Sequence, residues 1–359
     1  MKNIILISCL AFAQIVVSQN SSGTADLKSA EIVNSTALSL LDNTAAVIIS
    51  NPDSKDFSVN TENLSNISFD FSLNKGKLSG LEYYGLGKNT SDFKRVTSDK
   101  LLKPYISGVL NKNDSIANFA VGISVNIVTI FRAKKQDMID GYQIMRNAAD
   151  VIAKKADEIM VRDYPNLDRI TNTNEYNLQR VKIMDSLPSK KLKEFPEILK
   201  HPFLMLDFAS AYSVLYPAKT YKTSQPDRLG IWSTLTISPK LIGANNYLNF
   251  YGFIRYIEDK AVYNKTNLNY NDQFKYFDFG GKIQFDFNDL SIGYEYIKRN
   301  GDGKDYRSVG LIQYKVNTDV YLTGGFGKNF TSDADKDLVT LFGIRWGVNS
   351  KDKRDWATK

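Results

Sequence analysis

The feature that most constrains the fold is the alternation of apolar with polar or small residues from Gly230 to Gly347. In the segment 277–287, Phe279 and Phe285 fall on odd positions, whereas Asp278 and all other polar residues fall on even ones. Because successive side chains of a strand point to opposite faces, such a strand has one apolar and one charged face. Segments of about ten residues with this pattern, joined by short turns and longer loops, are typical of a membrane-spanning β-barrel.

A soluble β-sandwich alternates in the same way, with its apolar face turned toward a second sheet. The chain contains 20 Tyr and 20 Phe, many near segment ends, where the aromatic residues of a barrel lie at the membrane interfaces. Glu295 and Arg345 lie on the polar faces of their segments, and burial in a dry sandwich core would be costly for them. The predicted fold is therefore all-β and transmembrane, an antiparallel up-and-down barrel of about twelve strands with an α-helical insertion.

The chain is expected to divide into successive parts along its length. Residues 1–18 are typical of a signal peptide, because Lys2 precedes an apolar run that ends in small residues. After it we expect a periplasmic N-terminal segment (19–43), a first group of barrel strands (44–132), a helical insertion (133–200), a second group of strands (201–348) and a charged C-terminal tail (349–359).

The first group of strands is predicted from shorter patterns. Ala45–Ile49 is a possible first strand, and 66–73 alternates clearly. Asn74-Lys75-Gly76-Lys77 has the composition of a tight hairpin, so the return strand is expected at Ser79–Leu86, followed by a polar loop. A long strand is expected at 117–131. The second group is expected at 202–216, 228–238, 247–256, 274–287, 290–298, 306–316, 319–327 and 338–347.

Between the two groups the period changes from two to that of a helix. Asn174–Leu187 and Lys190–Lys200 are also predicted to be helical. The apolar stripe of the first helix is interpreted as an internal packing seam, with a partner-binding face as the alternative. The stripe consists of Met138, Tyr142, Met145, Ala149, Ile152, Ala156 and Ile159.

Loop lengths predict the orientation of the barrel, because such barrels have short periplasmic turns and longer outer loops. Asn288-Asp289 and Asn317-Thr318 are short connections. Counting strands back from them places the helical insertion on the periplasmic side as well. The prediction depends on the parity of the strand count.

Charged side chains recur on the polar faces of the expected strands. If lipid covers the opposite faces, these side chains point into the lumen, where they line a path in a wide barrel or pair and close a narrow one. Both outcomes fit about twelve strands, and the mixture of signs predicts no strong ion preference. The candidates are Asp70, Glu82, Asp207, Arg255, Asp278, Lys282, Asp286, Glu295, Arg307 and Arg345.

Few residues could carry chemistry. Cys9 is the sole cysteine and lies in the expected signal peptide, so no thiol chemistry is expected in the mature chain. His201 is the sole histidine, and no Ser-containing motif marks a partner for it. Catalysis by a Ser–His pair, as in an outer-membrane lipid hydrolase, is the weakest hypothesis.

No cofactor and no metal site are expected. The run Gly324–Lys328 lacks the spacing of a phosphate-binding loop and is interpreted as a bend or bulge in a strand. Asp333, Asp335 and Asp337 alternate as calcium ligands can, but the glycine and glutamate of a calcium loop do not follow. A solvated loop is the favoured interpretation.

The net charge of +7 is scattered along the chain and does not indicate nucleic-acid binding. The sequence resembles the outer-membrane β-barrel proteins of Bacteroidota. The resemblance rests on Phe12-Ala13-Gln14 in the signal peptide, on Asn51-Pro52-Asp53-Ser54 and on the aromatic hairpins that run to Trp346. The charged tail beyond Trp346 departs from barrel chains that end on an aromatic residue.

The leading hypothesis is a non-enzymatic channel or small-solute uptake protein in the outer membrane of a Gram-negative bacterium, surrounded by lipid. The alternative is a closed barrel that anchors the helical insertion for a periplasmic protein partner.

Overall fold

The computed structural model describes two groups of strands, separated in sequence by two helices. The described residues are 35–42, 44–48, 57–62, 66–72, 95–96, 105–112, 116–132, 135–167, 169–186, 202–217, 222–241, 246–264, 266, 269–287, 289–316, 320–330 and 338–348. The helices are α2 (Thr36–Leu40), α4 (Lys135–Asp163) and α5 (Thr173–Ser186). The strands are β1 (Phe57–Glu62), β2 (Asn66–Ser72), β3 (Arg95–Val96), β4 (Tyr105–Lys112), β5 (Ile116–Ile130), β6 (Leu204–Pro217), β7 (Gln225–Ile237), β8 (Asn246–Asn264), β9 (Asn269–Phe287), β10 (Leu290–Gly301), β11 (Asp305–Lys315), β12 (Val320–Lys328) and β13 (Leu338–Val348).

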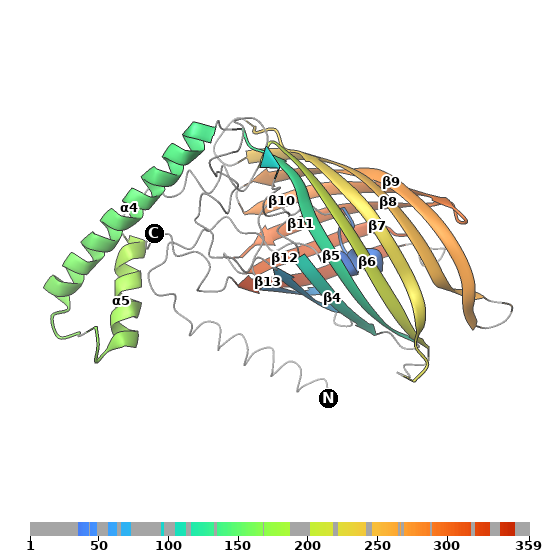
Figure 1. The fold of residues 1–359 in the computed structure, drawn as a ribbon, viewed down its shortest axis with the longest axis horizontal. Coiled ribbons are helices and arrows are strands. Elements are labelled where there is room, and N and C mark those ends of the chain that lie inside the picture. The colour runs from blue at the N-terminus through green and yellow to red at the C-terminus, as the bar shows by residue number, and fades with distance from the viewer. Residues whose placement is uncertain are drawn as a thin grey trace.

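Twelve of these strands close into one antiparallel ring (Figure 1). The hydrogen-bonded order runs β5-β4-β2-β1-β13-β12-β11-β10-β9-β8-β7-β6, and β6 pairs with β5 to complete the ring. The short β3 pairs with β5 beyond the end of β4. Closure leaves no long unpaired edge, which is the condition for a sheet to cross a membrane.

The outward face of the ring is apolar. Phe279, Phe285 and Phe342 are 40%, 40% and 63% exposed, whereas Asp278 and Glu295 on the opposite face are fully buried. A sandwich would show the reverse, with the aromatic side chains inside and the charged ones outside. The prediction of an antiparallel transmembrane barrel is confirmed.

Two predicted strands of the first group differ from the structure. Ala45–Ile49 was expected as the first strand and is wrong, because residues 44–48 are not in a strand and β1 begins at Phe57. The apolar side chains of 45–48 are all buried, so their run of apolar residues packs inside the protein and does not alternate between lipid and lumen.

The second difference concerns the partner of β2. This partner is β4, with Phe71 opposite Ile106, in the region where a polar loop was expected. Gly108 on the outward face and Val109 on the buried face interrupt the alternation of β4, and Pro104 directly before it is typical of a loop. The predicted return strand Ser79–Leu86 lies outside the described residues. The described ring has twelve strands, the number that was predicted.

The helical insertion contains α4 and α5, which agree with the first two predicted helices and lie beyond one end of the ring (Figure 1). The α4 helix turns Ile152, Ala156 and Met160 into a buried seam, and Arg180 of α5 forms an ion pair with Asp157 of α4. The side chains of Met138, Tyr142, Met145 and Ala149, and the third predicted helix at Lys190–Lys200, lie outside the described residues. Ile159 of the predicted stripe is half-buried.

Among the described helices, none is both long enough and apolar enough to cross a membrane.

The antiparallel order assigns the connections to two ends. The start of β1 and the end of β13 lie at the same end of the ring as α4 and α5. The turns between β9 and β10 and between β11 and β12 also lie at this end. The even strand count that the orientation prediction required is therefore present. The side of the membrane on which this end lies stays a prediction.

Candidate functional site: the occupied lumen

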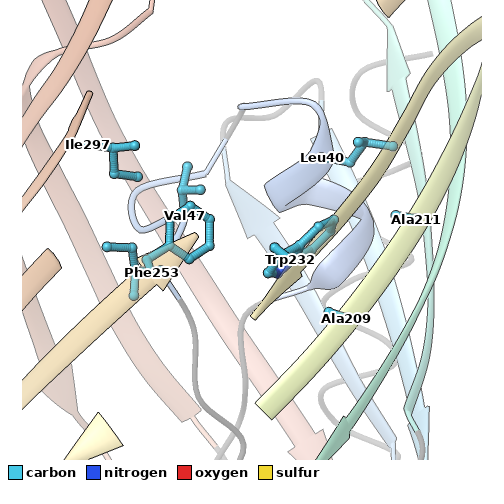
Figure 2. Close-up of a cluster of buried hydrophobic side chains, with 8 residues drawn as sticks. Leu40, Val47, Ala209, Ala211, Trp232, Phe253 and Ile297 are labelled. Carbon is cyan, nitrogen blue, oxygen red and sulfur yellow. The ribbon is translucent and has the colours of Figure 1, made fainter. Parts of the chain in front are cut away.

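The lumen of the ring contains a piece of the chain that precedes β1. We call residues 35–42 and 44–48 the lumenal segment (Figure 2). It begins with α2, a short helix whose five residues are all buried. The Ser35 side chain accepts from the Leu38 N–H at 3.4 Å, and the Ala37 N–H donates to Ser107 Oγ of β4 at 2.9 Å. The prediction that residues up to 43 lie in the periplasm is therefore wrong for 35–42.

Apolar contacts explain why this segment lies inside the ring. Leu40, Val47 and Ile48 form one buried cluster with inward-facing side chains of the wall, as Figure 2 shows for the residues labelled there. The wall residues of the cluster are Ala209, Ala211, Trp232, Phe253 and Ile297. A second buried cluster joins Ala37, Leu38 and Leu41 to Val109 and Ala120. Burial removes these side chains from water on both sides of the contact, which stabilises the occupied lumen.

Inward-facing glycines give the segment room. A Cβ atom at Gly230 would lie 2.6 Å from Leu40 Cδ1, and one at Gly325 would lie 3.1 Å from the Cβ atom of Ala45. The glycine-rich run 324–328 forms part of β12, and Gly325 within it allows close approach of the segment. In the same run Gly327 has a φ of 154°, a conformation that favours glycine.

Asp42 is the charged anchor of the segment. Its Oδ1 atom accepts from Arg255 Nη2 at 2.7 Å, and its Oδ2 atom accepts from Arg299 Nη2 at 3.1 Å and from Arg228 Nη1 at 3.3 Å. Burial raises the pKa of this carboxyl group, but the three guanidinium groups outweigh burial and hold the pKa well below its ordinary range. Asp42 is therefore a carboxylate at neutral pH.

Carboxylates of the wall hold the same three arginines. Asp278 accepts from Nε of Arg255 at 2.9 Å and from Nε of Arg299 at 2.8 Å. Asp259 accepts from Arg228 Nε at 2.8 Å. Paired and hydrogen-bonded in this way, charged groups can be buried without a large penalty.

A second polar contact fixes the end of the segment. The N–H groups of Val47 and Ile48 donate to Glu295 at 3.2 and 2.8 Å, and Arg307 Nε donates to the same carboxylate at 2.8 Å. Arg307 Nη2 also donates to the carbonyl oxygens of Thr44 and Ala45 at 2.7 and 2.8 Å. Side chains of the wall thus satisfy backbone N–H and C=O groups of the segment, which would otherwise be buried without hydrogen bonds.

Half of the predicted lumen residues meet at this segment or its direct partners. Arg255, Glu295 and Arg307 bind it as described, and Asp278 holds two of the arginines. Lys282 donates from Nζ to the carbonyl oxygen of Ile48 at 3.0 Å and lies over the ring of Tyr251.

The other predicted lumen residues lie elsewhere. Asp70 accepts from Asn60 Nδ2 at 3.2 Å and Asp207 from Asn126 Nδ2 at 2.8 Å, and both carboxylates are buried. Arg345 is buried, and Asp286 is half-buried beside Asn249 and Gln284. Glu82 lies outside the described residues.

Asp42, Arg228, Asp259 and Arg299 were not predicted. Arg299 follows the expected end of its strand by one residue and shares a face with Glu295. Asp259 likewise lies beyond the expected end of its strand, on the face of Arg255. Continuing each alternation to the next polar turn would have found both residues. No pattern indicated that Asp42 enters the ring.

One cavity adjoins the segment among the described residues. This cavity of ≈ 40 Å³ is lined by Ala45, Ala46, Lys282 and Arg345, among others. A water needs roughly 10–15 Å³ on this measure, so the cavity has room for a few waters. The cavity is too small to hold an organic solute.

The described part of the chain contains no group of three or more His, Cys, Asp or Glu residues that could hold a metal. His201, on which the hydrolase hypothesis depended, lies outside the described residues. The same is true of Asp333, Asp335 and Asp337.

No protein-family model matches the chain. No curated protein matches it in sequence. Among solved structures, the outer membrane protein Omp33 of Acinetobacter baumannii is similar over 82% of this chain and 98% of its own, with 10% identity and a TM-score of 0.34. The KdgM porin is similar over 82% of this chain and 99% of its own, with 9% identity and a TM-score of 0.34. LpxR from Salmonella typhimurium is similar over 81% of this chain and 98% of its own, with 7% identity and a TM-score of 0.35. Similarity at this level carries no information about a ligand or an activity.

Proposed function

We propose that the protein is a non-enzymatic outer-membrane channel for small solutes and that the lumenal segment closes it at rest. The observation that supports this most strongly is the position of the segment in the chain. It precedes β1, and none of its described residues belongs to a strand of the ring. Its departure would therefore leave the strand-to-strand pairing of the ring in place.

The contacts of the segment account for a closed resting state. Departure would expose Trp232 and Phe253 to water and would remove the Asp42 carboxylate from its three arginines. Both changes are unfavourable, so the open state is the minor one until something favours it.

A closed barrel that anchors α4 and α5 is the second candidate. The filled lumen favours it, and so do apolar side chains exposed on the helical insertion. Val161 and Ile170 are 73% and 86% exposed, as residues of a partner-binding surface would be. In this case the periplasmic partner would bind the helices and the segment would never leave.

Conductance in planar lipid bilayers separates the two candidates. The full chain is expected to open rarely, and a variant that lacks residues 35–48 is expected to conduct continuously. A variant that lacks 133–200 is expected to behave as the full chain, because the helices lie outside the ring. The electrophoretic mobility of unheated samples checks that each barrel has folded. If the folded variant without 35–48 is silent, the channel is refuted and the anchor is favoured.

A further inference from the structure

We propose that Arg228, Arg255 and Arg299 form a carboxylate-binding site of the channel and that Asp42 occupies it as an internal ligand in the closed state. The solute class that fits is a small organic acid with further oxygen acceptors close to its carboxylate, such as a hydroxy acid. The inference rests on the proposed function, since a solute reaches the site only when the lumenal segment leaves.

The contacts of Asp42 define the ligand. The arginines donate to both oxygens of its carboxylate. Arg255 Nη1 also donates to the carbonyl oxygen of Ser39 at 2.7 Å, and Arg228 Nη1 donates to that of Leu40 at 3.4 Å. A carboxylate with hydroxyl or carbonyl oxygens next to it would reproduce both sets of contacts. A simple inorganic anion would reproduce only the contacts of the carboxylate and would leave those of the two carbonyl oxygens unmade.

The wall holds the three guanidinium groups without help from the segment. Asp278 binds Nε of Arg255 and Arg299, and Asp259 binds Nε of Arg228. Arg299 also stacks on aromatic rings, with its Cζ atom 3.7 Å from the ring centroid of Phe330 and 4.7 Å from that of Tyr276. These contacts fix the arginine positions, so their remaining donors point at the site before a ligand arrives.

The charge at the site favours an anion once the segment has gone. The wall carboxylates in contact with the three arginines are Asp259 and Asp278. Asp227, which precedes Arg228 in the chain, accepts hydrogen bonds from Asn118 and Ser213 and also interacts with Arg228 electrostatically. Loss of Asp42 therefore leaves three guanidinium groups in contact with two carboxylates, and this excess of positive charge in a confined space is costly. An organic acid that replaces Asp42 offsets this cost and so shifts the channel toward the open state.

Gluconate and the neutral polyol sorbitol test this in bilayers at constant ionic strength. Because charge-assisted hydrogen bonds are stronger than those between neutral groups, gluconate is expected to raise the open probability of the full chain about tenfold or more. Sorbitol is expected to have no effect. The channel with Asp42→Asn is expected to open in the absence of gluconate. Asp286→Asn, which removes a lumen carboxylate whose hydrogen bonds come from the wall residues Asn249 and Gln284, is expected to respond as the unmodified chain does.

Calorimetry on the variant that lacks residues 35–48 provides a second measurement that needs no conductance. Gluconate and a synthetic peptide of residues 35–48 are expected to compete for this variant, and the peptide with Asp42→Asn is expected to bind about tenfold more weakly. If this variant conducts but binds neither gluconate nor the peptide, the carboxylate site is refuted and the channel stands. If it is silent yet binds both, the site stands and the channel is refuted.

Discussion

Arg255 Nη2 donates to Asp42 Oδ1 over 2.7 Å, although the two residues are 213 positions apart in the sequence. The hydrogen bond joins the lumenal segment to β8 on the wall of the barrel. It lies at the centre of a buried network in which Arg228 and Arg299 share the same carboxylate. The network makes Asp42 the residue on which closure of the lumen depends most.

Removing the charge of Asp42 should therefore loosen the segment and leave the ring intact. In Asp42→Asn, amide hydrogen exchange within 35–48 is expected to rise about tenfold or more, because a charged acceptor shared by three donors is lost. Exchange in β8 and β9 is expected to stay unchanged. Asp286→Asn serves as the matched control and should alter neither region. Equal protection of the segment in both variants would show that Asp42 does not hold it.

Glu295 should matter for stability more than a charged residue at the rim. Glu295→Gln leaves the guanidinium of Arg307 buried without its carboxylate, and breaking a buried pair costs about 3–5 kcal/mol. The double change Glu295→Leu with Arg307→Met is expected to recover part of that loss, since no unpaired charge remains.

Denaturant titration of the protein in lipid vesicles measures these changes. The control is Glu258→Gln, because the Glu258–Lys260 pair is partly exposed and separated by 3.7 Å, so its loss should cost little. A loss in Glu295→Gln no larger than in Glu258→Gln would contradict the assignment.

The alternation of the strands and the charges on their inner faces could be predicted from the sequence, because lipid on one side and a polar lumen on the other impose a period of two. Arg255, Asp278 and Glu295 were found in this way. The strand β4 was not predicted, because Gly108 on its outward face and Val109 on its buried face interrupt the alternation.

The occupant of the lumen could not be predicted either. Ala45–Ile49 is short and apolar, and a run of this kind fits a buried strand as well as a buried loop. Its position depends on contacts with residues such as Ile297 and Glu295, nearly 250 positions away. Local periodicity contains no information about contacts at such a distance.

A charge placed on the outward face should destabilise the barrel. Ile254 is exposed near the middle of β8, and an Arg at the membrane midplane costs about 2–4 kcal/mol. Ile254→Arg is therefore expected to lower the free energy of unfolding in vesicles by that amount, whereas Ile254→Leu should change it little. Equal stability of the two variants would mean that lipid does not cover this face.

The orientation of the barrel can be tested with single cysteines, because Cys9 in the expected signal peptide is the sole natural one. Lys154 on α4 and Lys304 between β10 and β11 are both exposed and lie at opposite ends of the ring. On intact cells, a membrane-impermeant maleimide is expected to label Lys304→Cys and to spare Lys154→Cys. Labelling of Lys154→Cys alone would reverse the predicted orientation.

The most direct test of closure by the lumenal segment is a reversible covalent lock. A Cβ atom at position 325 would lie 3.1 Å from that of Ala45, and disulfides have Cβ separations of about 3.5–4.5 Å, so a small shift allows the bond. The single variants Ala45→Cys and Gly325→Cys are the controls, and neither should respond to reductant. The doubly substituted protein is expected to be silent in planar bilayers when oxidised and to open as the single variants do after reduction. Equal conductance before and after reduction, with the disulfide verified by mass spectrometry, would contradict closure by this segment.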